Sequence, residues 1–264
     1  MQSRPIRRVA WSGGGSPLDG ERTLPEEAPI AFSYQGASYA VMMATPSDLV
    51  DFAHGFSLTE GLVSAKSEIE AVDIVRAETG IVLRVTLATS RAALFWERRR
   101  HLAGPSGCGL CGIESLAQAL RPLPGVDSEL AMASAAVADA MASLSRLQYL
   151  NQETRAVHAA AFWHRDLGVM LLREDIGRHN ALDKLAGAMA RAGLEAGRGA
   201  ILLTSRVSVE MVQKAAMIGS PIIIAISAPT TLAVRLADRA GITLAAIARG
   251  DGFEVFSRPD RFRW

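Results

Sequence analysis

The sequence has almost no net charge. Its 264 residues include 28 lysines and arginines against 27 aspartates and glutamates, which gives a formal net charge of +1. A protein that binds nucleic acid or an anionic membrane through bulk electrostatics carries a clear excess of positive charge. We therefore expect no nucleic acid and no membrane as a partner, and an anionic ligand would have to be bound by a few local groups.

Long hydrophobic runs are also missing. The longest apolar segments, such as residues 221–226, are too short to cross a bilayer. The basic N-terminus is followed by residues 11–15, Trp-Ser-Gly-Gly-Gly, rather than by the apolar stretch of a secretory signal. These absences predict a cytoplasmic protein, and in that compartment a lone cysteine pair is more often reactive than a structural disulfide.

Only two cysteines occur, and Cys108 and Cys111 both lie in the glycine-rich segment 104–112. Glycine leaves the backbone free to adopt unusual conformations and lets another molecule approach the thiols closely. Residues 113–120 have the apolar spacing of a helix, which places Cys111 near a helix N-terminus, where a thiolate is stabilised. This pattern predicts sulfur chemistry.

Three kinds of cysteine site are candidates for this pair. A structural zinc ion needs four ligands, and because the sequence has no second Cys-x-x-Cys pair, two chains would have to share one ion. We therefore predict no permanently bound metal. A thioredoxin-like redox pair would follow an early strand, whereas this pair follows the arginine-rich segment 96–101. A sulfur carrier needs one nucleophilic thiolate. From the local residues alone, sulfur transfer and redox exchange remain equal alternatives.

Residues 1–125 predict a smaller α+β domain that ends with the cysteine segment. Residues 30–34 and 38–43 bracket Gln35-Gly36 as a hairpin, and residues 45–48 predict the start of a helix. Residues 68–87 contain two further strands around Thr79-Gly80. The segment 121–125, rich in proline and glycine, then interrupts the chain, and an alanine-rich helix over 128–150 connects the halves.

Residues 126–264 predict an α/β domain. Strands at 168–172, 200–204, 221–227 and 242–248 alternate with helices at 179–191, at 208–219 and after Thr230 or Thr231. Such alternation predicts a largely parallel sheet with helices on both faces, in which ligands bind at the carboxyl ends of the strands.

The predicted carboxyl ends carry hydroxyls, arginines and helix-start amides, which suit a phosphate or a nucleotide. Each group alone could equally be a helix cap or a solvated loop, and it is their gathering at one edge that favours a ligand site. The segments are Arg173–Asn180 with Asp183 and Lys184, Thr204–Ser208, Ser227–Thr231 and Arg249–Gly252.

Long motifs in fixed order resemble the FdhD family of formate dehydrogenase accessory sulfurtransferases. In the first half, Pro29 and the segments 45–48 and 55–61 follow the family pattern. The resemblance covers almost the whole chain and favours sulfur transfer over redox exchange. The longest matching motifs are residues 107–112, 174–184, 205–215 and 227–234.

The resemblance implies a sulfur carrier that accepts persulfide sulfur from a cysteine desulfurase. It implies transfer of that sulfur to the molybdenum of the bis(molybdopterin guanine dinucleotide) cofactor, a bound substrate required for formate dehydrogenase activity. The implied partners are the desulfurase, the catalytic subunit of formate dehydrogenase and a second copy of the chain. The implied fold of residues 126–264 is a cytidine deaminase-like, three-layer α/β/α domain.

The resemblance also assigns residues. Cys108 corresponds to the persulfide carrier, the role of Cys111 stays open, and the family's cofactor segment maps to residues 247–252. His158 joins His179 and Asp183 as a candidate for orienting the cofactor or moving protons. With the residues at the strand ends, the predicted cofactor-binding set is Ile247, Ala248, Arg249, Gly250, Asp251, Gly252, Ser205, Arg206, Ser227, Thr230, His179, Asp183 and Lys184.

One departure from the family pattern stands out. Family members usually carry Thr-Gly-Gly where this chain has Thr154-Arg155-Ala156. Because glycine would admit a ligand close to the backbone, we expect Arg155 to supply an additional phosphate contact instead. A non-catalytic chaperone that binds the molybdenum cofactor is the alternative function. A zinc-dependent nucleoside deaminase would need a His-x-Glu motif, which the sequence lacks.

Overall fold

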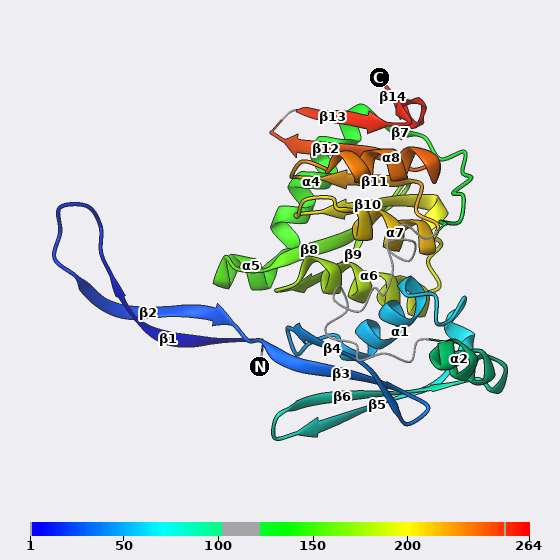
Figure 1. Ribbon diagram of the computed structural model, residues 1–264. Coiled ribbons are helices and arrows are strands. Elements are labelled where there is room, and N and C mark those ends of the chain that lie inside the picture. The colour runs from blue at the N-terminus through cyan, green and yellow to red at the C-terminus, as the bar shows by residue number, and fades with distance from the viewer. Residues whose placement is uncertain (1, 102–121, 251) are drawn as a thin grey trace.

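A computed structural model of the chain describes residues 2–101, 122–250 and 252–264 (Figure 1). The cysteine segment and the helix expected at 113–120 lie outside these residues. The helices are α1 (Leu49–Thr59), α2 (Thr89–His101), α4 (Ser134–Leu147), α5 (Tyr149–Thr154), α6 (Arg178–Ala192), α7 (Val209–Met217) and α8 (Thr231–Arg239), with short 3-10 turns η1 (Lys66–Glu68), η2 (Ala196–Arg198) and η3 (Pro259–Arg261). The strands are β1 (Ser3–Ala10), β2 (Leu18–Pro25), β3 (Ala28–Tyr34), β4 (Ala37–Ala44), β5 (Ile69–Ala77), β6 (Gly80–Leu87), β7 (Met132–Ala133), β8 (His158–His164), β9 (Gly168–Asp175), β10 (Gly199–Leu203), β11 (Ile222–Ala225), β12 (Thr243–Arg249), β13 (Gly252–Ser257) and β14 (Phe262–Arg263).

The N-terminal half contains a four-stranded sheet in the order β4-β3-β6-β5. The hairpin expected around Gln35-Gly36 is confirmed, and both of these residues have positive φ angles, 52° and 80°, as a tight two-residue hairpin turn requires. The two strands expected around Thr79-Gly80 are also confirmed as β5 and β6. Helix α1 begins after Asp48, as the sequence predicts.

Helix α1 covers one face of this sheet. Alternate residues of β3 point toward it, and the Phe32 ring lies 4.2 Å from the Phe56 ring and 4.9 Å from the Phe52 ring, centroid to centroid. The opposite face of the sheet is less covered. On that face, the β4 residues Val41 and Met43 are 52% and 48% exposed. The sheet therefore has one packed face and one open face.

The second sheet has six strands in the order β13-β12-β11-β10-β8-β9. Strands β10, β11 and β12 are parallel, as expected, but β8 is antiparallel to both β10 and β9 and lies between them. The expectation of a largely parallel sheet is thus corrected to a mixed sheet. Because β9 and β10 are each antiparallel to β8, they run in the same direction as each other. The carboxyl ends of β9, β10, β11 and β12 therefore lie at one edge of the sheet.

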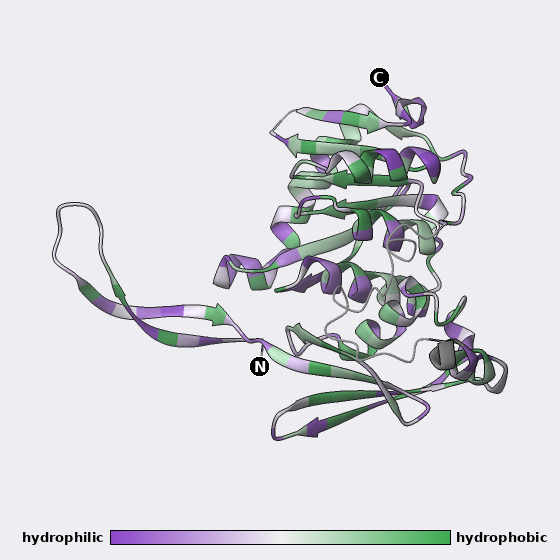
Figure 2. Ribbon diagram, viewed as in Figure 1, coloured by the Kyte–Doolittle hydropathy of each residue, from purple (hydrophilic) through white to green (hydrophobic). Residues whose placement is uncertain are grey.

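Helices cover both faces of the six-stranded sheet. Phe162, Ile201 and Ile223 pack with α6, α7 and α8, whereas the neighbouring residues Leu202 and Ile224 pack with α4. Successive side chains of a strand point to opposite faces of the sheet, so neighbouring residues pack against different helices. The central strands are accordingly almost entirely apolar (Figure 2), and the predicted three-layer arrangement is confirmed.

Helices α1 and α6 join the two sheets through an unusually close contact. A Cβ atom on Gly55 would lie 1.6 Å from the carbonyl oxygen of Asp183, and one on Gly187 would lie 1.8 Å from that of Asp51. Only glycine fits at either position, because no real Cβ approaches another atom so closely. The domain division predicted at residue 125 stays a prediction.

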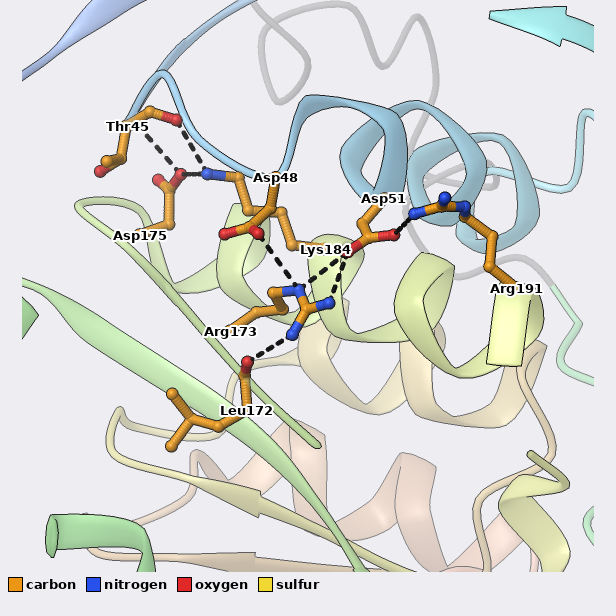
Figure 3. Close-up of polar contacts among 8 residues, drawn as sticks. All are labelled: Thr45, Asp48, Asp51, Leu172, Arg173, Asp175, Lys184 and Arg191. Carbon is orange, nitrogen blue, oxygen red and sulfur yellow. Dashed lines mark hydrogen bonds and ion pairs between the residues drawn. The ribbon is translucent and has the colours of Figure 1, made fainter. Parts of the chain in front are cut away.

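Ion pairs lie along the same contact (Figure 3). The buried carboxylate of Asp51, on α1, lies between Arg173 and Arg191, with its Oδ2 atom 2.7 Å from Nη2 of Arg173. Lys184, on α6, lies 2.6 Å from Asp175 and donates a hydrogen bond of 2.8 Å to the carbonyl oxygen of Thr45.

Strands β1 and β2 form a two-stranded arm that projects from the body (Figure 1). The arm touches the rest of the chain mainly at its base, where β2 contacts α5 and Ser3 bonds to Glu153. Its tip leaves Val9, Trp11 and Leu18 about two-thirds exposed. Within the described parts of the chain, no helix is long and apolar enough to cross a membrane.

Candidate functional site

A cavity of about 590 Å³ opens between α4 and the β12–β13 hairpin, at the carboxyl edge of the six-stranded sheet. Its size falls within the usual range for small-molecule sites. Four members of the predicted cofactor segment line it, together with small side chains of α4. The lining residues are Ser134, Ala135, Val137, Ala138, Met141, Ala142, Ser145, Ile226, Ala248, Arg249, Gly250, Gly252 and Phe253.

The cofactor segment has an irregular backbone. Ile247 has a φ angle of 54°, in the left-handed region that β-branched residues rarely adopt, and the pairing of β12 with β13 shifts register between Ala246 and Arg249. Gly250 also has a positive φ angle, 61°, at the turn. A non-glycine residue in this conformation costs about 1–3 kcal/mol, and such residues concentrate at functional sites. This observation therefore singles out the segment independently of its motif.

Arg249 is held at the mouth of the cavity. Its Nε atom donates a hydrogen bond of 2.9 Å to the carbonyl oxygen of Ile226, which leads into Ser227. The residue is exposed and also lines the cavity. An arginine in this position can form charge-assisted hydrogen bonds with an anionic ligand.

The hydroxyl groups of two predicted ligand-binding residues form hydrogen bonds with nearby backbone groups. Ser205 is buried and donates its hydroxyl to the carbonyl oxygen of Arg206, 3.0 Å away. Thr230 is the N-cap of α8, and its Oγ1 accepts a hydrogen bond of 3.3 Å from the amide of Ala233. Arg206 is exposed after β10. Capping is therefore one established role of Thr230, while ligand contacts of these residues stay predictions.

His179 lies at the start of α6, on the side of the sheet opposite α4. Burial is the main cause that lowers the pKa of His179 to about 4, and the nearby charges of Arg178 and Lys214 act in the same direction. The imidazole is therefore neutral near pH 7. Within the described residues, the buried Nε2 of His179 and Nε of Arg178 have no hydrogen-bond partner. Burial and the charge of Arg178 also lower the pKa of His158.

Asp183 and Lys184 occupy a different environment from the one expected. Both are completely buried in the contact between α1 and α6 rather than exposed at the sheet edge. Asp183 accepts a hydrogen bond of 2.6 Å from Thr59 and pairs with Lys214 at 2.9 Å, and Lys184 pairs with Asp175. The hydrogen bonds from Thr59 to Asp183 and from Lys184 to the carbonyl oxygen of Thr45 join the two halves of the chain. The charges of both side chains are thus paired inside the protein, and their role in ligand binding stays a prediction.

The position of Arg155 explains why a glycine would be favoured there. Arg155 is the C-cap of α5 and has a φ angle of 58°, the left-handed conformation in which many helices end and which glycine adopts at least cost. Its side chain is exposed and does not line the cavity. The glycine of the family pattern is thus explained by the helix end, and the phosphate contact expected of Arg155 has no support from its position.

Replacing Arg155 with glycine is expected to raise the free energy of unfolding by about 0.5–1 kcal/mol, because glycine adopts a positive φ angle without a steric penalty. Chemical denaturation measures this change. The matched control is Arg146→Gly, in the last turn of α4, where the same replacement should lower stability by a similar amount. A loss of stability in both variants would contradict the explanation from the helix end.

Cys108, Cys111 and Asp251 lie outside the described residues, and their roles stay predictions. In the parts of the chain that are described, no three His, Cys, Asp or Glu side chains gather as a metal site would require.

The sequence interpretation missed the α4 wall of the cavity. Residues 128–150 read as an alanine-rich connector, yet four small side chains of α4 line the cavity at positions 135, 138, 142 and 145. Their spacing of three and four residues places them on one helix face. That spacing of alanine and serine is the signal that could have identified a face left open for a ligand.

Comparisons with known proteins agree with this architecture. Residues 25–263 match the model of the FdhD/NarQ family. Relatives named "Sulfur carrier protein FdhD" include one from Agrobacterium fabrum, 54% identical over 97% of this chain and 95% of the relative, and one from Brucella abortus, 52% identical over 98% and 96%. A crystal structure from Desulfotalea psychrophila, described as a putative formate dehydrogenase accessory protein, superposes with a TM-score of 0.79 at 25% identity and covers all of both chains. The chain therefore belongs to the FdhD/NarQ family.

Proposed function

We propose that this protein is a sulfur carrier that supplies sulfur to the molybdenum cofactor of formate dehydrogenase. The observation that carries the proposal is the match along nearly the whole chain to relatives named as sulfur carriers. The chain has two cysteines in all, and both lie in one glycine-rich segment. Family and thiol chemistry therefore support the same function.

The chemistry requires one thiolate and two partners. The Cys108 thiolate attacks the terminal sulfur of a persulfide on a cysteine desulfurase, a new S–S bond forms, and the donor cysteine leaves as a thiolate. In the second step the acceptor's electron pair forms a bond to that terminal sulfur. The S–S bonding pair then returns to Cys108, which regains its thiolate. Delivery to the molybdenum of the bis(molybdopterin guanine dinucleotide) cofactor makes the protein a sulfurtransferase.

The cavity beside α4 is the proposed site for a guanine nucleotide part of that substrate. Arg249 supplies a cation at the mouth, and the exposed Gly250 lines the cavity beside it without a side chain. The small side chains of α4 leave room for a planar base. The positions of these groups support binding of a phosphate-bearing ligand at the predicted cofactor segment.

Intact-protein mass spectrometry tests the carrier step. After incubation with a cysteine desulfurase and cysteine, the protein should gain one sulfur atom that a thiol reductant removes. The adduct should persist in Cys111→Ala and be lost in Cys108→Ala. Absence of any adduct, combined with retained nucleotide binding, would instead favour a cofactor-binding chaperone.

Filling the cavity is expected to weaken nucleotide binding. In Ala138→Phe, a large ring projects from an exposed position of α4 into the cavity, so the dissociation constant for GDP should rise at least about tenfold, or about 1.4 kcal/mol. Calorimetric titration at two salt concentrations measures it, and affinity should fall with salt because the phosphate contacts are exposed. Asp139→Phe, at an exposed neighbouring position that does not line the cavity, is the control. Equal GDP affinity in both variants would place the nucleotide elsewhere.

A further inference from the structure

Three basic side chains gather where β8 begins and β9 ends. His158 is the first residue of β8 and lies opposite Asp175, the last residue of β9. Arg178 and His179 are the first two residues of α6, which follows β9. Burial is the main cause that lowers the pKa of both histidines, and the nearby charge of Arg178 is the next. We call Arg178, His158 and His179 the basic cluster.

Two nitrogen atoms of the basic cluster are buried without a partner. Within the residues that the structure describes, Nε of Arg178 and Nε2 of His179 form no hydrogen bond. The arginine Nε always carries a proton, so it can only donate, and a neutral imidazole offers one N–H group of its own. Native proteins rarely bury such groups unpaired, and a bound ligand or ion is one explanation when they do. Both atoms therefore favour a ligand with acceptor atoms.

The charge of Arg178 is also left unpaired. Arg173, near the end of β9, forms an ion pair with Asp51, whereas Arg178 pairs with no carboxylate among the described residues. Glu210, on α7, lies 3.9 Å from Nε2 of His179, which is too far for a hydrogen bond. Because both histidines are neutral near pH 7, Arg178 supplies the positive charge of the cluster, and this charge is available to an anion.

The basic cluster lies at the opposite end of the sheet from the cavity beside α4. The β12–β13 hairpin lines the cavity, and the strands β11, β10 and β8 stand between β12 and β9. Because neighbouring strands are about 4.8 Å apart, roughly 19 Å separates the two places. The helices divide them as well, since α4 covers one face of the sheet and α6 covers the other (Figure 1). One small ligand group therefore cannot contact both.

We propose that the basic cluster binds a phosphate group of the substrate, at a site separate from the cavity beside α4. Nε of Arg178 and the imidazole of His179 donate hydrogen bonds to the phosphate oxygens, and the guanidinium charge strengthens the first of these bonds. The N-terminus of α6 adds the positive end of a helix dipole. The bis(molybdopterin guanine dinucleotide) substrate has two nucleotide arms, so its phosphates lie at more than one place along it. The identity of this ligand rests on the proposed function.

Titration of the full-length protein with inorganic pyrophosphate, followed by the NMR signals of the histidine side chains, tests the proposal. The chain has five histidines, and the His179 signal is the one lost in His179→Gln. Pyrophosphate should shift the signals of His179 and His158 but not that of His164, at the other end of β8. The dissociation constant from the His179 signal should rise at least about tenfold in Arg178→Gln. It should fall in Glu210→Gln, because a negative charge beside the site is removed.

Arg198→Gln is the matched control. It removes the same charge from an exposed arginine that precedes β10, at the opposite edge of the sheet, and should leave the dissociation constant unchanged. Circular dichroism establishes that every variant is folded. The proposal is overturned if pyrophosphate does not shift the His179 signal of the wild type, or if Arg178→Gln binds as tightly as the wild type. Equal losses in Arg178→Gln and Arg249→Gln would place pyrophosphate at the cavity and would also overturn it.

Failure of this inference can be told apart from failure of the proposed function. The persulfide adduct is measured by mass spectrometry and does not depend on pyrophosphate. A normal adduct without pyrophosphate binding at the basic cluster overturns the phosphate site alone. Pyrophosphate binding at the basic cluster without any adduct confirms the phosphate site and overturns the carrier function.

Discussion

Formate dehydrogenase activity is expected to fall to background when the only copy of this protein in a cell carries Cys108→Ala. A persulfide can be held only on a thiol sulfur, and alanine removes that atom while changing little else. The residue lies in a segment whose sequence is rich in glycine, and glycine has little side-chain surface to pack, so we expect that loss of activity does not reflect loss of the fold. Activity in extracts of a strain that lacks the native gene and expresses the variant measures this effect.

Cys111→Ala is the matched control for this result. It removes the other thiol of the same segment and should leave a measurable part of the activity if Cys111 only assists. Immunoblots must show equal amounts of both variants. Full activity with Cys108→Ala would exclude Cys108 as the carrier and would leave Cys111 or a chaperone role to explain the requirement for the protein.

Gly55→Ala is expected to lower the free energy of unfolding by at least about 3 kcal/mol, the upper end of the usual range for overpacking. The added methyl group would overlap the backbone carbonyl of Asp183, which cannot rotate away as a side chain could. Alanine favours a helix over glycine by about 1 kcal/mol, which is too little to offset the overlap. The helices would have to separate, and the ion pairs of Asp51 and Lys184 would weaken with them.

Denaturant unfolding of Gly55→Ala, compared with Gly197→Ala, measures this effect. Gly197 lies in the turn η2, where an added methyl group would have no other atom within 4 Å and where the φ angle is not positive. Its replacement should therefore change stability by no more than about 0.5 kcal/mol. Gly187→Ala should behave like Gly55→Ala, because its methyl group would meet the carbonyl oxygen of Asp51. Similar stabilities of all three variants would mean that α1 and α6 can move apart at little cost in the free energy of unfolding.

Much of the fold could be predicted because local signals agreed with the final structure. Each of β10, β11 and β12 is a buried, largely apolar run, and the helices after β10 and β11 begin or end near residues that favour those positions, such as Thr230 and Gly219. Strand β8 was missed because its sequence, residues 158–164, contains three alanines and no valine, isoleucine or threonine, and alanine is uncommon in strands. The arm was missed because its strands have few apolar residues and pack on little of the chain.

The candidate site was harder to predict than the fold. The residues 247–252 could be named from their motif, but the cavity also depends on which strands α4 packs against, and the spacing of small residues on α4 does not specify those strands. Asp183 and Lys184 were assigned to a ligand because charged residues in a long motif suggest chemistry. Their partners Thr59 and Thr45 are distant in the sequence, and the packing of α1 on α6 brings them together.

The contact between α1 and α6 also sets an order of events during synthesis. Asp51 is separated from Arg173 by 122 positions and from Arg191 by 140, and Thr59 is separated from Asp183 by 124. While the first half of the chain leaves the ribosome, the partners of Asp51 do not yet exist, and burying an unpaired carboxylate is strongly unfavourable. Helix α1 can therefore pack on α6 only after α6 has been synthesised, and until then the surface around Gly55 stays uncovered. Closing so long a loop is slow, so the nascent first half is the stage at which this protein is most exposed to proteases and chaperones.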